Sequence, residues 1–384
     1  MIIQLNNQKI QITSNDKIKN IETMNSSKIT PPTHVDKDYC LSQFLAFRYV
    51  FNPEKEFAEG LNHQNYVRIP NSAKTLVANA EETDLAIRNV FRLIQNEKLG
   101  MLLSGGMDSA VLASYMPEGA DAYTFRFLGG EFQKDELERA KQFADYYKLN
   151  LHYIEIDWDI VEQSLPAVMK HKGAPVHSIE PQIYYAAQQA KKNGITMMVI
   201  GDGADYVFGG MDGLLSKDWS FYQYVKRSIY IDPKDVLVNP ADISDLFEQY
   251  RIGKNSIDYI RFYDEPVTDE SYASYENAFE SAEMPFIDPY DHLKLSCPLD
   301  LGRIRNGESK YIIRELFKMK YPHLEVPQKN PMPRPVDKYF ANWEGPKRPE
   351  FRKDIDMSKL TGNQKWLLWV AEQFLNTIEK HNSW

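Results

Sequence analysis

The chain has 384 residues, of which 43% are hydrophobic and 26% are charged, and its formal net charge is −9. This length and composition are typical of a globular protein that buries a sizeable core. The acidic balance argues against a dedicated nucleic-acid-binding protein. Cysteine occurs only at Cys40 and Cys297. Without a CxxC pair, neither a disulfide framework nor a zinc ribbon is expected.

The sequence also lacks the signals of a membrane or exported protein. The N-terminus has no basic segment followed by an apolar run, and no stretch approaches the ~18 uninterrupted apolar residues that a bilayer span needs. We therefore expect a cytoplasmic protein with neither a membrane nor a nucleic acid among its partners.

The first part of the chain predicts small elements. Residues 1 to about 35 are polar with short alternating runs, which predicts a small β element and then a linker. The apolar residues between 41 and 50 have helical spacing. Residues 65–70 predict an edge strand that is closed by proline. A second helix is expected over 81–95, where apolar residues recur on one side.

From residue 100 onward the pattern alternates between strand and helix. Apolar runs predict strands before Ser104 and over 123–127, 149–156 and 195–200, with helices over 135–147 and 181–192. This alternation predicts βαβ units and an α/β fold in which a parallel sheet is flanked by helices. The residues beyond Met211 are aromatic, charged and mostly helical in character.

A Gly-rich turn follows the first of these strands, with the sequence Ser104-Gly105-Gly106-Met107-Asp108-Ser109. Its backbone N–H groups can surround an anion, and the two glycines let the main chain approach a phosphate closely. The lysine of a kinase-type P-loop is absent, and Asp108 is suited instead to Mg²⁺ that the phosphates also bind. An ordinary left-handed turn is the alternative.

A second turn, Gly201 to Gly210, follows the apolar strand 195–200. A dinucleotide fingerprint needs glycine where Tyr206 stands, so that interpretation fails. Both turns come at the carboxyl ends of strands, where parallel sheets bind ligands. Asp205 is therefore expected opposite Asp108, with Mg²⁺ between them, whereas helix capping is the alternative role.

Five motifs in order resemble one family, the synthetase domain of the glutamine-dependent asparagine synthetases. The family includes the β-lactam and carbapenam synthetases and the lasso-peptide cyclases, and it belongs to the ATP-pyrophosphatase (PP-loop) superfamily. The resemblance covers roughly residues 80 to 335. The matching motifs are Ser104 to Ser109, Gly173-Ala174-Pro175 with Glu180-Pro181, Gly201 to Gly210, Pro285-Phe286-Ile287-Asp288 and Ile304 to Glu315, which contains Lys310-Tyr311-Ile312-Ile313-Arg314-Glu315.

The resemblance implies an adenine nucleotide α-hydrolase-like PP-loop fold and an AMP-forming carbon–nitrogen ligase that uses ATP and Mg²⁺. A carboxylate, from a small molecule or a peptide, would be adenylated and then joined to ammonia or an amine. Lys310 matches the family's catalytic lysine, and Asp202 stands where asparagine synthetases carry a glutamate base. Asp108 and Asp205 would hold the metal. The implied nucleotide contacts are Leu103, Ser104, Gly105, Gly106, Asp108, Ser109, Phe127, Gly201 and Lys329.

The N-terminal part departs from the family. Position 2 is Ile2 where the asparagine synthetases carry a cysteine nucleophile that hydrolyses glutamine. We therefore expect residues 1–75 to be a truncated, inactive α+β remnant of the glutaminase domain and residues 76–384 to form the ligase domain. Ammonia would then come from solution or from a separate glutaminase, unless the nucleophile is a substrate amine.

The loop beside the expected metal site also differs from the family's pattern. Tyr206 replaces an acidic residue and Met211 replaces a tyrosine, and both changes are expected to reshape the acceptor pocket. The region 214–283 is expected to supply specificity, and His177 is a further pocket candidate. An intramolecular amide cyclase and a non-catalytic scaffold descended from the enzyme remain alternatives.

Overall fold

A sheet of seven strands lies at the centre of the computed structural model, which describes residues 2–5, 8–11, 34–63, 65–128, 133–328 and 335–381. The strands are β1 (Ile2–Leu5), β2 (Gln8–Gln11), β6 (Leu99–Leu102), β7 (Asp121–Phe127), β8 (Asn150–Ile156), β9 (Met197–Val199) and β12 (Phe286–Ile287). Their order is β2-β1-β12-β9-β6-β7-β8. The strands from β12 to β8 run parallel, while β1 and β2 are antiparallel additions at one edge. The predicted α/β fold class is confirmed.

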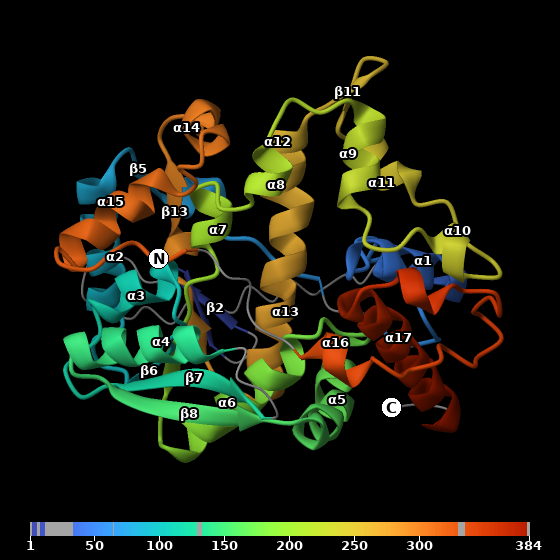
Figure 1. Ribbon diagram of the computed structural model, residues 1–384, viewed down its shortest axis with the longest axis horizontal. Coiled ribbons are helices and arrows are strands. Elements are labelled where there is room, and N and C mark those ends of the chain that lie inside the picture. The colour runs from blue at the N-terminus through green and yellow to red at the C-terminus, as the bar shows by residue number, and fades with distance from the viewer. Residues whose placement is uncertain are drawn as a thin grey trace.

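Helices cover both faces of this sheet (Figure 1). They are α2 (Ala80–Leu93), α3 (Met107–Ala113), α4 (Lys134–Tyr146), α5 (Trp158–Lys172), α6 (Glu180–Lys192), α13 (Thr268–Ser281) and α15 (Tyr311–Lys320). Met101, Ala122 and Val199 pack into a core with α2, α3, α4 and α15. Tyr123 and Ile154 pack into a second core with α5, α6 and α13. Neighbouring strand residues thus face opposite cores, which is why these strands are apolar on both sides.

The remaining elements are short, except at the C-terminal end. The helices are α1 (Lys37–Phe47), α7 (Ala204–Val207), α8 (Asp212–Leu215), α9 (Phe221–Ser228), α10 (Pro233–Val236), α11 (Ser244–Glu248), α12 (Tyr259–Phe262), α14 (Leu301–Arg305), α16 (Val336–Tyr339) and α17 (Gly362–His381). Short strands form three two-stranded pairs, namely β3 (His34–Val35) with β4 (Lys55–Glu56), β5 (Thr75–Val77) with β13 (Leu293–Leu295), and β10 (Arg251–Ile252) with β11 (Ser256–Ile257). The part beyond Met211 is mostly helical, as predicted.

Single-turn helices complete the list of elements. They are the 3₁₀ turns at Asn71–Ala73, Pro289–His292 and Met357–Lys359, and a π turn at Tyr263–Val267 that leads directly into α13. A third core lies among α8, α9, α11 and α12, where Leu215, Tyr224 and Phe247 are buried.

The predicted edge strand over 65–70 is wrong, because no strand forms there. Side chains, rather than a neighbouring strand, hold this segment. The N–H of Tyr66 donates to the Tyr49 hydroxyl at 2.9 Å, and Arg68 pairs with Asp269 at 2.6 Å. Backbone polar groups that are satisfied by side chains do not require a sheet partner.

The segment before residue 75 shares its cores with the rest of the chain. Cys40 and Phe44 of α1 lie in the same core as Leu368 of α17, and β1 extends the central sheet. The division into 1–75 and 76–384 stays a prediction. In the described part of the chain, no helix is both long and apolar enough to cross a bilayer.

Candidate active site

The first Gly-rich turn lies between β6 and α3. Side-chain oxygens fix its shape: the Ser104 N–H donates to Ser109 Oγ at 3.1 Å, and the Gly106 N–H donates to Ser104 Oγ at 3.1 Å. The two hydroxyl oxygens lie 3.0 Å apart. Ser104 and Ser109 therefore brace the turn from within. The helix that follows begins at Met107, so that Asp108 lies in its first turn.

Packing against α4 explains the first glycine of this turn. A Cβ atom at Gly105 would lie 2.5 Å from the backbone oxygen of Glu136. Arg139, one helical turn further along α4, donates from Nε to the Gly105 oxygen at 2.9 Å. Glycine at 105 is thus required by the helix that presses on the turn, whether or not a phosphate binds. Gly106 is less crowded, since its Cβ would meet only Ser104 Oγ at 3.1 Å.

The second turn follows β9 and is held by a buried carboxylate. Asp288 accepts hydrogen bonds from the Gly203 N–H at 2.6 Å and from the Tyr290 N–H at 2.9 Å. Burial raises the pKa of Asp288 well above its ordinary value. The Tyr290 hydroxyl in turn donates to the Asp108 backbone oxygen at 2.9 Å. Asp288, which follows β12, thereby ties the two Gly-rich turns together.

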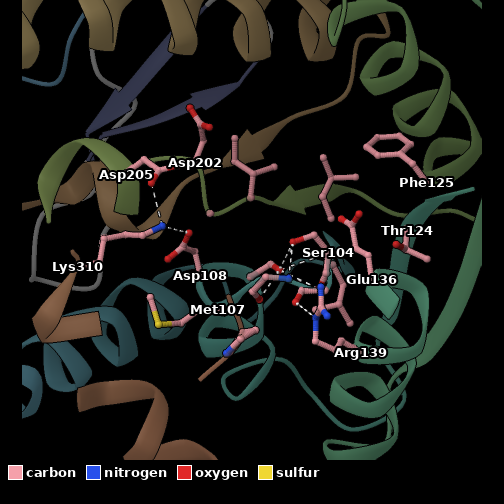
Figure 2. Close-up of a pocket in the computed structure, with 18 of the residues that line it drawn as sticks. Ser104, Met107, Asp108, Thr124, Phe125, Glu136, Arg139, Asp202, Asp205 and Lys310 are labelled. Atoms are coloured by element: carbon pink, nitrogen blue, oxygen red, sulfur yellow. Dashed lines mark hydrogen bonds and ion pairs between the residues drawn. The ribbon is translucent and has the colours of Figure 1, made fainter. Parts of the chain in front are cut away.

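Lys310 joins the acidic side chains of the two turns (Figure 2). Its Nζ lies 2.5 Å from Asp108 Oδ2 and 2.9 Å from Asp205 Oδ1. The lysine is 4% exposed. Burial alone lowers its pKa, but Asp108 and Asp205 more than offset that effect and raise the pKa above its ordinary value. The ammonium therefore remains charged and sits between two carboxylates.

These groups line a cavity of about 220 Å³ at the carboxyl ends of the parallel strands. The structure brings together most of the residues predicted for the site, namely Leu103, Ser104, Gly105, Gly106, Asp108, Ser109, Gly201, Asp202, Asp205 and Lys310. Lys329 lies outside the described residues. Asp202 also lines the cavity, and it accepts a hydrogen bond from Ser271 of α13 at 2.7 Å.

Phe127 lies apart from the other residues predicted for the site. It is 3% exposed, packs into the core beneath the sheet and is not among the residues that line the cavity. Its N–H donates to the Gln133 side chain at 2.7 Å, so the strand end is closed off at this point. Thr124 and Phe125, earlier on β7, line the wall instead. The nucleotide contact at Phe127 stays a prediction.

Sequence reasoning missed the wall that α4 provides. Glu136 and Arg139 both line the cavity (Figure 2). Burial raises the pKa of Glu136, an effect that Arg139 opposes. The two residues are three positions apart, a spacing that places them on one side of a helix, and a helix was predicted there. That spacing was the signal available in the sequence.

The residues present suit a magnesium nucleotide. Asp108 and Asp205 offer hard oxygen ligands, and a cation already lies between them in the form of the Lys310 ammonium. No group of three or more His, Cys, Asp or Glu side chains in the described ranges is arranged to hold a metal by itself. Mg²⁺ in proteins commonly takes one or two carboxylates and completes its shell with substrate phosphates and water. The donor set fits that pattern.

Comparison with known proteins agrees with the motifs. Residues 88–256 match the family model described as Asparagine synthase. This part of the chain is therefore similar to the asparagine synthases. A probable glutamine-hydrolysing asparagine synthetase of Dictyostelium discoideum is 25% identical over 197 residues, which cover 46% of this chain and 35% of that protein. A Lotus japonicus asparagine synthetase is 26% identical over 204 residues, or 48% of this chain and 31% of that protein.

Two other proteins match parts of the chain. A 7-cyano-7-deazaguanine synthase of Picrophilus torridus is 47% identical over 57 residues, which are 15% of this chain and 24% of that protein. A solved structure of the U34-tRNA thiolase NcsA from Methanococcus maripaludis covers 68% of this chain and 87% of its own, at 15% identity and a TM-score of 0.27. The chain spans about a third of the length of the asparagine synthetases that it matches.

Proposed function

We propose that the chain is an ATP-dependent ligase that forms amide bonds by adenylating a carboxylate. The observation that carries this proposal is the placement of Lys310 between Asp108 and Asp205 beside the Ser104–Ser109 turn. One lysine and two carboxylates from separate segments surround the place where a phosphate-binding turn would hold pyrophosphate. The asparagine synthetases among the relatives support the same class of reaction.

In the first step a carboxylate oxygen of the substrate attacks the α-phosphorus of ATP. A new O–P bond forms, and the bond from the α-phosphorus to the bridging oxygen breaks, so that pyrophosphate leaves with the electron pair. The Lys310 ammonium stabilises the charge that develops on pyrophosphate, together with N–H groups of the first turn other than those of Ser104 and Gly106, which donate within the turn. Mg²⁺, held by Asp108 and Asp205, would supply further neutralisation of the phosphates.

In the second step ammonia or an amine attacks the activated carbonyl carbon and AMP leaves. The nitrogen must lose a proton, and we assign that task to Asp202, a carboxylate that lines the cavity. Ser271 holds one of its oxygens at 2.7 Å. A hydrogen bond to the carboxyl group fixes its direction, which a base needs in order to act on a bound amine.

Product analysis tests this function. The protein is incubated with ATP, Mg²⁺, ammonium and a panel of carboxylates that includes aspartate, uronic-acid sugar nucleotides and small peptides, and AMP, ADP and pyrophosphate are separated by chromatography. We expect AMP and pyrophosphate in equal amounts with one acid. We expect Asp108→Ala to lower their formation by a factor of about 100 or more.

The matched control is Asp235→Asn, which changes an exposed carboxylate of α10 and should leave the rate unchanged. Formation of ADP would contradict the mechanism, because the α-phosphorus would not have been attacked. Failure to bind ATP at all would favour the non-catalytic scaffold. Omitting ammonium separates an ammonia-dependent ligase from an enzyme that uses an amine of its own substrate.

A further inference from the structure

A second cavity, of about 450 Å³, is lined by other residues than the cavity around Ser104, Asp108 and Lys310, which the proposed function assigns to ATP and which is called the nucleotide cavity below. Its walls come from segments that are far apart in the sequence: the end of α1, the loop before α6, the α8–α9 region, α13 and the start of α17. Its volume falls within the roughly 300–1,000 Å³ that is typical of sites for small organic ligands. No step of the proposed function has yet assigned it a ligand.

The two cavities are neighbours across α13 and the second Gly-rich turn. Glu270 of α13 lines the second cavity, whereas the next residue, Ser271, holds Asp202 in the first. Met211, which follows the turn directly, also lines the second cavity. Burial raises the pKa of Tyr206 well above its ordinary value, and the nearby charges of Asp202 and Glu270 add to the rise. The charges of carboxylates that line both cavities thus act on Tyr206.

The side of the second cavity nearest to Tyr206 is polar and charged. Arg48 Nη2 lies 2.8 Å from Glu270 Oε2, and Arg48 Nη1 lies 2.7 Å from His177 Nε2. Arg48 also lies over the ring of Tyr230, 4.0 Å from its centroid, and has a left-handed backbone with φ of 62°. These contacts therefore hold the Arg48–Glu270 ion pair in a fixed position.

Each member of the pair retains unused hydrogen-bonding capacity. Arg48 Nε and Glu270 Oε1 are buried and have no hydrogen-bond partner within the described ranges. Glu270 is 6% exposed. Leaving a buried charged group partly unsatisfied costs free energy, so a ligand that supplies the missing partners binds favourably. The ligand must offer an acceptor to Arg48 and a donor to Glu270.

The rest of the second cavity is apolar. Large hydrophobic side chains surround it, including Phe47, Phe51, Phe262, Trp366 and Leu367. Phe47, Phe262, Trp366 and Leu367 are each 5% exposed or less. A ligand bound in this cavity would therefore place an apolar body against these side chains and a polar head at Arg48 and Glu270.

We propose that the second cavity binds the carboxylate that the enzyme activates, and that this substrate is an amino acid or hydroxy acid with a large apolar side chain. This inference rests on the proposed function for the identity of the reacting group. The carboxylate pairs with Arg48, and the amino or hydroxyl group donates to Glu270. The apolar side chain lies among the aromatic residues, while the carboxylate end faces Tyr206 and the nucleotide cavity.

Equilibrium binding without nucleotide tests the proposal by isothermal titration calorimetry. The probes are phenylalanine, alanine, 3-phenylpropanoate and aspartate. Alanine lacks the ring, and 3-phenylpropanoate lacks the donor for Glu270. We expect phenylalanine to bind roughly tenfold or more tightly than each of the other three, since burying a ring or losing a charged hydrogen bond changes affinity by about that factor.

Two variants locate the binding. Ile229→Trp fills the cavity and should abolish phenylalanine binding, whereas Tyr222→Trp, an exposed position on α9, should not change it. Glu270→Gln should remove most of the preference for phenylalanine over 3-phenylpropanoate. Melting temperature and circular dichroism verify that each variant is folded.

Three results would overturn the substrate class. They are equal affinity for phenylalanine and alanine, unchanged binding in Ile229→Trp, and binding of none of the four acids by a folded protein. These binding results are obtained without ATP. They are therefore distinct from a failure of the proposed function, which is judged by AMP formation. Tight binding of phenylalanine without AMP formation would reject the proposed ligase but support the binding site. AMP formation with aspartate alone would support the ligase but reject the proposed substrate class.

Discussion

Lys310 combines strain, burial and charge in one residue. Its backbone is left-handed, with φ of 53° and ψ of 41°, at the residue that precedes α15. Residues other than glycine and asparagine rarely adopt this backbone conformation, which costs them about 1 kcal/mol or more. The two ion pairs to Asp108 and Asp205 offset that cost. Strain that persists because of specific contacts is a common property of functional positions.

We predict that Lys310→Met separates the two roles of this lysine. AMP formation should fall by a factor of about 100 or more, because the pyrophosphate charge loses a preorganised cation. Without nucleotide, Mg²⁺ should raise the melting temperature of the variant more than that of the wild type. In the wild type the ammonium already neutralises Asp108 and Asp205, and in the variant the two carboxylates are left to the metal.

Differential scanning fluorimetry with increasing Mg²⁺ measures this effect. Lys318→Met is the matched control, since Lys318 is an exposed lysine of the same helix, and it should respond to Mg²⁺ as the wild type does. A melting temperature of Lys310→Met that is indifferent to Mg²⁺ would mean that the two aspartates do not form a metal site.

At the scale of elements, a buried ionic network joins α5, α6 and α13. Lys172 lies 2.6 Å from Glu180 Oε1, and both are 2% exposed or less. Asn277 donates to Glu180 Oε2 at 2.5 Å and to the Val168 oxygen at 3.0 Å. The His177 N–H also donates to Glu180. The network therefore fixes α13 and the loop before α6, which carry Glu270 and His177 into the second cavity.

We predict that Lys172→Met lowers the free energy of unfolding by about 3–5 kcal/mol, because Glu180 would be left as a buried charge without its cation. Urea denaturation followed by circular dichroism measures the change. Lys170→Met, an exposed substitution on the same helix, should change stability by less than about 0.5 kcal/mol. Equal stability of the two variants would show that this network does not hold the three helices together.

The sequence predicted the elements whose residues repeat with a clear period. The helix expected over 81–95 is α2, the strand expected over 149–156 is β8, and the helix expected over 181–192 is α6. The two Gly-rich turns meet because both follow parallel strands of one sheet, β6 and β9, which are direct neighbours. That part of the site follows from topology, so local patterns were sufficient.

Contacts between distant segments could not be predicted in this way. Lys310 was assigned from its motif, but its position between Asp108 and Asp205 depends on how α15 packs on α2 and α3. The position of Phe127 outside the cavity lining has a similar cause, since its N–H bonds to Gln133 and Thr124 lines the cavity instead. No periodicity in the sequence reports such packing.

At the scale of the whole molecule, the second cavity depends on two helices that are far apart in the sequence, α1 and α17. Arg48 follows α1 and Trp366 belongs to α17, and these two helices share one core (Figure 1). Trp366 lines the cavity and donates from its indole nitrogen to the Val176 oxygen at 3.0 Å. The nucleotide cavity, in contrast, is lined by residues between 102 and 328. Global packing thus affects the second cavity more directly than the first.

We predict that substitutions of Trp366 lower the free energy of unfolding more as they remove more of its buried contacts. Trp366→Phe loses a buried hydrogen bond but keeps an aromatic ring, and should lower the free energy of unfolding by about 1–2 kcal/mol. Trp366→Ala leaves a void and should cost about 3–5 kcal/mol. Urea denaturation of both variants measures the difference, and Trp343→Phe, a substitution of a partly exposed tryptophan near the same core, is the control.

ATP affinity should remain unchanged in Trp366→Phe, because Trp366 does not line the nucleotide cavity. A loss of ATP affinity in that folded variant would instead mean that the two cavities respond to the core as one unit.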